Sequence, residues 1–158
     1  MGCYAMSKEF FKVPKKEKPV VLWVHPEGRV VGTVFVREQS LHHIGEESLS
    51  ELLNQPEPFL VIYRDDIQEY RFYNKSSIIR IEYEYEAEAH AEEECIACEM
   101  HMMDGSLMAG RICGVFSPDK SRLYDHLNKE GDQYIALRVE SGQVHLMNKS
   151  YIIYVNSL

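Results

Sequence analysis

The sequence predicts a mainly β fold made of two tandem, five-stranded, partly open small barrels of the Sm/SH3-like kind, each with one short inserted helix. Three observations lead to this prediction. The segment 48–81 aligns without a gap on the segment 122–155. Short runs of β-branched and aromatic residues alternate with turn signals, which is typical of strands. Five strands in about sixty residues bury one face only by curling, which favours a small barrel over a flat sheet.

The internal duplication is clearest in a set of matched leucines and polar residues and in the last turn of each copy. The segment 74–79 of the first copy lies on 148–153 of the second, and both begin with Asn-Lys-Ser. The other matches are Leu49 with Leu123, Leu53 with Leu127, Asn54 with Asn128 and Arg64 with Arg138. A single copy would be marginal in size, so pairing of the two copies buries surface that one copy would leave exposed.

The elements of the first copy follow from its residues in order. A hairpin is expected around the turn Pro26-Glu27-Gly28. Ser48 can cap a short helix that carries three leucines and that ends before Pro56. The Asn-Lys-Ser segment should form the turn of a second hairpin. The expected strands are 20–24, 30–36, 59–63, 70–73 and 78–83.

The second copy repeats this order after an acidic connection. Its expected strands are 96–103, 107–116, 134–139, 143–147 and 151–155, with a helix near 121–127. The predicted organisation is a basic N-terminal tail at 1–18, a first barrel-like repeat at 19–83, an acidic linker at 84–94 and a second barrel-like repeat at 95–158.

The composition favours a cytoplasmic protein that has no strong attraction to polyanions. The formal net charge is −8 and the sequence pI is near 5.4, which opposes nonspecific binding to nucleic acid and to anionic membranes. The basic stretch 8–18 is the main exception. No signal peptide is recognised, and no apolar run approaches the ~20 residues that span a bilayer. The four cysteines, Cys3, Cys95, Cys98 and Cys113, are therefore expected to be reduced thiols.

The sequence also carries a motif pattern: an Asp-Gly hairpin, Arg-Leu-x-Asp-x-Leu-Asn, an apolar strand and Asn-Lys-x-x-Ile. In the second copy its residues are Asp104, Gly105, Arg122, Leu123, Asp125, Leu127, Asn128, Asn148, Lys149 and Ile152. The first copy keeps Gly28, Leu49, Leu53, Asn54, Asn74, Lys75 and Ile78. This pattern resembles a bacterial family of uncharacterised small β-domains. More distantly, it resembles the Sm-like barrel of ring-forming RNA-binding proteins, which carry their helix before the first strand.

The candidate binding residues are Asn74, Lys75, Asn148 and Lys149. Asn tolerates a left-handed backbone and closes an Asx turn, and the lysine after it is expected to point outward. In one interpretation the two lysines contact phosphate or carboxylate at equivalent points of the two barrels. In the other, a tight hairpin simply needs these residues, and turn chemistry favours this second interpretation.

The Cys95-Ile96-Ala97-Cys98 segment has a spacing that is typical of zinc or redox sites, and His90 and His101 flank it. A structural zinc site usually takes a second pair of ligands from another loop, and no such pair follows. Two partly buried thiols and no metal are therefore expected. His42 and His43 are expected to be loop residues.

No nucleophile motif, phosphate loop or HExxH pattern occurs, so the sequence predicts neither an enzyme nor a cofactor. The first functional hypothesis is a protein-interaction or assembly module. Its exposed strand edges and Tyr-rich strands would meet a protein partner or another copy of the chain, with no role at a membrane. The alternative is an Sm-like RNA-binding protein whose tandem barrels form a ring. In that case Lys75, Lys149, Arg71 and His145 would lie on one rim.

Overall fold

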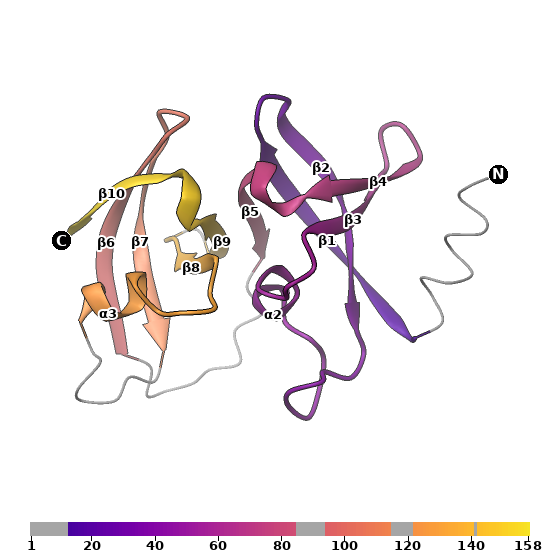
Figure 1. Ribbon diagram of the computed structural model, residues 1–158, viewed down its shortest axis with the longest axis horizontal. Coiled ribbons are helices and arrows are strands. Elements are labelled where there is room, and N and C mark those ends of the chain that lie inside the picture. The colour runs from indigo at the N-terminus through magenta and orange to yellow at the C-terminus, as the bar shows by residue number, and fades with distance from the viewer. Residues whose placement is uncertain (1–12, 85–93, 115–121, 141) are drawn as a thin grey trace.

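The computed structural model describes residues 13–84, 94–114, 122–140 and 142–158, and they form one ten-stranded antiparallel sheet. The first half holds β1 (Lys15–Val24), β2 (Gly28–Arg37), α2 (Leu49–Leu53), β3 (Phe59–Arg64), β4 (Glu69–Asn74), the 3-10 helix η1 (Lys75–Ser77) and β5 (Ile78–Glu84). The second half holds β6 (Glu94–Met102), β7 (Leu107–Gly114), α3 (Leu123–Leu127), β8 (Tyr134–Arg138), β9 (Gln143–Asn148), the 3-10 helix η3 (Lys149–Tyr151) and β10 (Ile152–Ser157). Figure 1 shows the two halves side by side.

The strand order in the sheet is β10-β6-β7-β8-β9-β5-β1-β2-β3-β4. Within each half the order is therefore the same, with the fifth strand outside the first and the fourth at the other end. The two halves join where β5 pairs with β9, and the sheet does not close. The predicted mainly β class is confirmed, whereas the division into two barrels and the Sm/SH3 likeness stay predictions.

The local signals in the sequence place the elements within a few residues. Ser48 accepts a hydrogen bond from the backbone N–H of Glu51, and the Glu51 side chain reaches back to the cap, so α2 begins with a capping box. The helix of the second half lies at the expected place, although Arg122 provides no side-chain cap. The helices of the described segments are all too short to cross a lipid bilayer.

The predicted boundaries of the tail and the linker can be compared with the ends of the observed strands. Strand β1 begins at Lys15, so the last four residues of the predicted tail 1–18 belong to the sheet and pair with β2. Lys16 and Lys18 in this segment form ion pairs with Glu46. At the linker, Glu84 ends β5 and Glu94 begins β6, and the residues between them lie outside the described segments.

Two buried apolar clusters form the core, and each takes residues from both halves. The first contains most of the buried apolar side chains of the first half together with Tyr134 and Leu146 of the second. The second contains buried residues of β6, β7, β8 and β9, among them Met100, Leu137 and Met147, together with Ile79 of β5. The clusters interlock across the β5–β9 joint, so each half completes the core of the other.

Two glycines mark the points where strands approach each other too closely for a side chain. A Cβ on Gly32 of β2 would lie 2.8 Å from the Tyr63 carbonyl oxygen, and a Cβ on Gly110 of β7 would meet the Arg138 carbonyl oxygen. Glycine is needed at both positions because backbone, which cannot rotate away, occupies the space of the side chain.

The same contacts show that β3 and β8 depart by one residue from the gap-free alignment. Tyr63 and Arg138 occupy the equivalent places opposite the two glycines, whereas the alignment matches Arg64 with Arg138. Four residues, 55–58, separate the helix cap from β3 in the first half, and five, 129–133, separate it from β8 in the second. The strand moves because loop length is free to vary, whereas burial fixes which side chains face the core.

We expect Gly32→Ala to lower the free energy of unfolding by about 1–3 kcal/mol, because the added methyl group must push β2 away from β3. Urea unfolding at equilibrium would measure this. The control is Val31→Thr, on the same strand, where the side chain is 47% exposed and the β-branched shape is kept. Equal midpoints for Gly32→Ala and the unmodified chain would contradict the close approach.

Candidate functional site

The two Asn-Lys-Ser turns, which the sequence places on separate repeats, lie at one groove. A groove of about 610 Å³ at the joint between the halves is lined by both turns. Its lining includes Asn74, Lys75, Ser76, Asn148 and Ser150, together with the loop after α2 and the start of β8. The turns meet because β5, which follows the first turn, pairs with β9, which precedes the second.

The asparagine of each turn caps a single turn of 3-10 helix. Asn74 and Asn148 each accept a hydrogen bond at 3.0 Å through Oδ1, from the backbone N–H of Ser76 and of Ser150. The predicted Asx turn is therefore confirmed. The left-handed conformation that Asn tolerates is not used, because φ is −67° at Asn74 and −72° at Asn148. An N-cap residue takes an extended conformation before a helical turn, which needs no left-handed residue.

Lys75 points inward, against the sequence-based prediction. Lys75 is buried, and its Nζ donates to the carbonyl oxygens of Leu52 at 3.2 Å and Gln55 at 3.1 Å. The Leu52 carbonyl lies in the last turn of α2, where a helix leaves carbonyl groups without internal partners, and the Gln55 carbonyl lies just after the helix cap. Burial lowers the Lys75 pKa. Lys75 therefore fastens the helix to the turn and does not offer its charge to a ligand.

Lys149 repeats this arrangement in a more open setting. Its Nζ donates to the Lys129 carbonyl oxygen at 3.0 Å, just after α3. Burial lowers its pKa, and the nearby Lys129 acts in the same direction. Both lysines of the repeated motif thus bind the chain that follows their helix.

The second asparagine does more than cap its turn. Asn148 is 1% exposed, and its Nδ2 donates across the joint to the Ile78 carbonyl oxygen at 2.9 Å. Its Oδ1 also accepts from Gln133 Nε2 at 2.7 Å. Asn74 is exposed, and its Oδ1 is bonded within its own turn. The same motif is therefore a local cap in one half and a bridge between halves in the other.

Tyr134 and Asn54 add further bonds across the joint. The Tyr134 hydroxyl donates to the Lys75 carbonyl oxygen at 2.6 Å, and burial raises the pKa of this phenol well above its usual range. Asn54, which caps the end of α2, accepts from the backbone N–H groups of Gln133 and Tyr134, each at 2.9 Å. The role of Asn54 was not predicted, although its match with Asn128 was a signal that could have indicated it.

A partly buried polar cluster lies on the β5–β9 joint. Glu82 accepts from Trp23 Nε1 at 2.8 Å and from Arg80 Nε at 3.3 Å, and the Arg80 guanidinium lies 4.5 Å above the Trp23 ring. His145 lies opposite Glu82 in the strand pair, with 3.7 Å between Nδ1 and Oε1. Burial lowers the His145 pKa, which disfavours its cationic form.

The predicted basic rim is therefore not assembled. His145 is buried in the joint and the Lys75 amine is committed to α2. Arg71 is exposed, but it lies on β4 at the outer end of the sheet and pairs with Glu69 at 3.2 Å. The four residues do not form one cationic surface, because Lys75 and His145 are buried and Arg71 lies on the outer strand β4.

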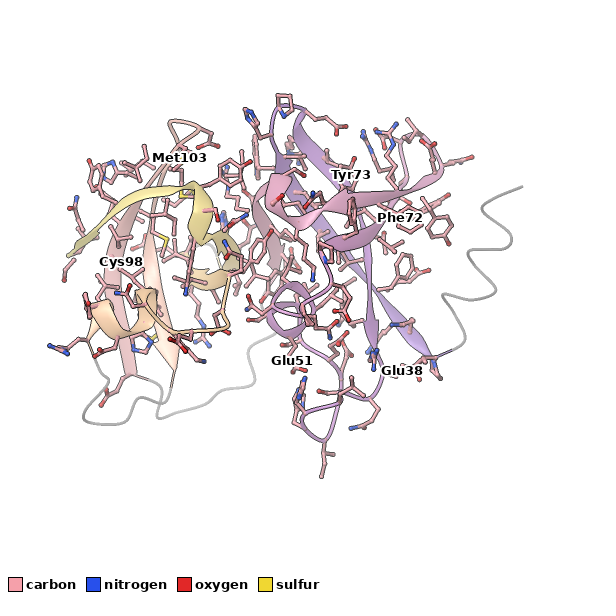
Figure 2. The ribbon with its side chains drawn as sticks, in the orientation of Figure 1. Glu38, Glu51, Phe72, Tyr73, Cys98 and Met103 are labelled. Atoms are coloured by element: carbon pink, nitrogen blue, oxygen red, sulfur yellow. A yellow bond between two sulfur atoms is a disulfide. The ribbon has the colours of Figure 1, made fainter. Side chains whose placement is uncertain are left out.

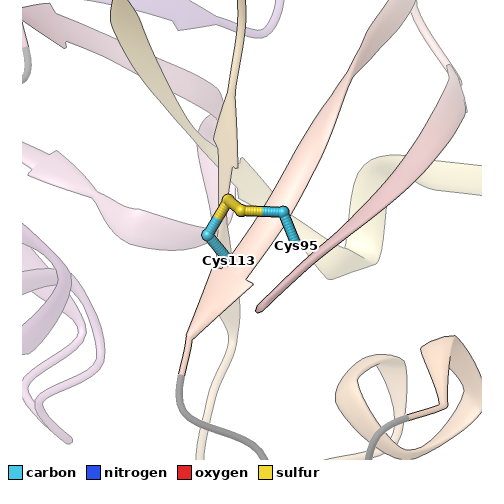
Figure 3. The surroundings of a disulfide bond; sticks show 2 residues. All are labelled: Cys95 and Cys113. Atoms are coloured by element: carbon cyan, nitrogen blue, oxygen red, sulfur yellow. A yellow bond between two sulfur atoms is a disulfide. The ribbon is translucent and has the colours of Figure 1, made fainter. Parts of the chain in front are cut away.

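The cysteines differ from the expectation of reduced thiols. Cys95 and Cys113 form a disulfide between directly opposite positions of β6 and β7, with 4.1 Å between their Cα atoms (Figure 3). Cys98 is free and fully buried, and burial raises its thiol pKa. Residues three apart on a strand face opposite sides of the sheet, so Cys95 and Cys98 do not converge on one site.

The histidines that the sequence offers as possible metal ligands make other contacts. The His101 side chain is 2.8 Å from Glu99 and stacks on the Tyr154 ring, with 4.0 Å between centroids. His43 contacts Glu51 and the Ile44 carbonyl oxygen on its loop, and these hydrogen bonds raise its pKa. His90 lies outside the described residues. Within the segments that the structure describes, no three His, Cys, Asp or Glu side chains gather to hold a metal ion.

Comparisons with protein-family models, with curated proteins and with solved structures found no match. Function is therefore inferred from the geometry of this chain alone.

We expect Asn148→Asp to lower the free energy of unfolding by about 3 kcal/mol. The aspartate keeps the acceptor of the turn but loses the donor to Ile78 and places a carboxylate among carbonyl groups. The matched control is Asn74→Asp, where only the acceptor is used and the expected change is below about 1 kcal/mol. Urea unfolding of both variants measures the difference, and equal losses would show that Asn148 does not bridge the halves.

We expect Cys98 to resist alkylation at neutral pH in the folded protein, because it is buried and its pKa is raised. Mass spectrometry without reductant should find Cys95 and Cys113 in one linked peptide pair. It should find Cys98 modified only after denaturant is added. Modification of Cys95 without a reductant would contradict the disulfide.

Proposed function

We propose that this chain is a non-catalytic protein-interaction or assembly module that receives partner strands at the two outer edges of its sheet. The observation that carries the proposal is that β4 and β10, which end the strand order, are six residues long and carry exposed large apolar side chains. Natural sheets usually protect their edges, because an unpaired edge is a template for another strand.

The backbone of both outer strands supports strand addition. Among the described strands, β4 pairs only with β3 and β10 only with β6, so in this part of the chain each leaves one row of N–H and C=O groups facing outward. Figure 1 places the two strands at opposite ends of the molecule. A partner strand would satisfy this row of backbone groups by ordinary sheet hydrogen bonds.

The side chains of these strands suit a protein partner. On β4, Phe72 is 58% exposed, and on β10 Ile153 is 60% and Tyr154 50% exposed (Figure 2 labels Phe72). Beside Phe72, the rings of Tyr63 and Tyr70 lie 4.9 Å apart between centroids and add a partly exposed aromatic surface. Aromatic and apolar groups of this kind supply most of the binding energy in protein interfaces.

The Sm-like RNA-binding alternative has less support from the geometry. It requires Lys75 and Lys149 to offer their charges to phosphate, and both amines instead donate to backbone carbonyls. A phosphate track also needs several clustered cations, and the net charge of −8 opposes one. Protein partners are therefore placed ahead of RNA.

The proposal is tested by introducing a photo-activated aromatic residue in place of Phe72 or of Tyr154 and irradiating cells that make the full chain. We expect both edge positions to give covalent adducts with protein. The same residue at Ile44, a loop position that is 98% exposed, should give none. Absence of protein adducts at both edges would overturn the proposal, and adducts with RNA would favour the Sm-like alternative.

A further inference from the structure

We propose that the strand received at each edge belongs to a second copy of this chain, with β10 of one copy pairing with β4 of the next in a head-to-tail arrangement. This inference rests on the proposed function and names the partner. The joint inside the chain supplies the template, because there the fifth strand of the first half, β5, pairs with the fourth strand of the second half, β9. The free edges are the remaining fourth strand, β4, and the remaining fifth strand, β10.

Apolar side chains that the internal joint buries have exposed counterparts on the free edges. Leu146 is the fourth residue of β9 and is fully buried, whereas Phe72, the fourth residue of β4, is 58% exposed. Ile79 is the second residue of β5 and is 5% exposed, whereas Ile153, the second of β10, is 60% exposed. Burial of apolar side chains stabilises a contact, and the free edges lack the cover that the internal joint provides.

The start of the third strand shows the same contrast. Tyr134 begins β8 and is 2% exposed, because it packs against the first half. Phe59 begins β3 and is 54% exposed. At the internal joint, the first half covers Tyr134 and Leu146 of the second. A second copy whose β10 pairs with β4 in the same way would cover Phe59 and Phe72 together.

The two fifth strands, β5 and β10, share a bulge at the same position. The pairing of β5 with β1 shifts register so that Ile79 has no partner, and the pairing of β10 with β6 shifts so that Ile153 has none. Such a bulge redirects the side chain of the extra residue. In β5 this residue enters the apolar cluster of the second half. In β10 the equivalent residue, Ile153, is exposed and enters no buried cluster of the described residues, and the core beside β4 of the next copy would provide one.

A polar residue at the free joint also lacks the partners that its counterpart has. Asn54 caps α2 and accepts from the N–H groups of Gln133 and Tyr134 across the internal joint. Asn128 caps α3, is exposed, and within the described residues uses only its Nδ2, which donates to the Tyr124 carbonyl oxygen at 2.9 Å. Across a copy-to-copy joint the Asn128 Oδ1 would accept from the backbone N–H of Phe59, which stands where Tyr134 stands.

The register of the free joint follows from the internal one. Ile81 pairs with Leu146, and Glu82 pairs with His145, in β5 and β9. The equivalent positions place Val155 opposite Phe72 of the next copy. They also place Asn156 opposite Arg71 of the next copy.

The first experiment uses one charge on each edge of the full chain. We expect the unmodified protein to increase in mass with concentration in sedimentation velocity, and Phe72→Lys and Ile153→Lys each to abolish this. A mixture of the two variants should form a dimer and nothing larger, because each keeps the edge that the other has lost. The control Leu107→Lys, at a position 53% exposed on the interior strand β7, should associate like the unmodified chain. Circular dichroism checks that every variant is folded.

The second experiment fixes the register with cysteines. Asn156→Cys and Arg71→Cys chains, mixed and mildly oxidised, should give a covalent dimer, and neither variant alone should exceed the unmodified chain in dimer yield. A dimer from Asn156→Cys alone would show a symmetric β10–β10 contact and would overturn the head-to-tail arrangement.

The outcomes separate this inference from the proposed function. A chain that stays monomeric at every concentration, while its edge positions still give adducts with another protein, would overturn the second copy and leave the interaction module standing. Absence of edge adducts together with a monomeric chain would overturn both.

Discussion

The pairing of β5 with β9 is the constraint on which the rest of the structure depends. It joins two groups of five strands into one sheet, and it lets Ile79 complete one core cluster while Tyr134 and Leu146 complete the other. Each half of a chain this size would bury only part of its apolar surface alone, so the exchange of side chains across the joint supplies what is missing. Strand hydrogen bonds and apolar burial reinforce each other there.

The joint also explains why one repeated motif has two roles. Asn74 and Asn148 cap identical short turns, yet only Asn148 faces another half of the chain and bonds to it. The motif is thus primarily a way to end the fourth strand and begin the fifth, with its lysine holding the helix that comes before. Binding across the joint occurs at Asn148, where the Ile78 carbonyl oxygen of the neighbouring half lies within reach.

An interface between a fifth strand and a fourth strand uses two different surfaces. Such a contact does not close on itself after one association, because each partner keeps one free edge of the opposite kind. The chain shows this directly, since after the internal joint is made both kinds of edge remain at its ends. The Cys95–Cys113 disulfide links β7 to β6, and β6 is the strand that pairs with the outer strand β10.

The sequence by itself determined the mainly β class, the order of the elements, the capping of α2 by Ser48 and the Asx turns at Asn74 and Asn148, because these depend on residues close together in the chain. Only the tertiary structure decided the inward direction of Lys75, the bridging role of Asn148, the Cys95–Cys113 disulfide and the one-residue offset of β3 against β8. The Asn148 bridge and the disulfide depend on which strands become neighbours, and sheet pairing joins residues that local patterns do not connect. The direction of Lys75 depends on where the end of α2 lies, and the offset of β3 depends on the length of the loop before it.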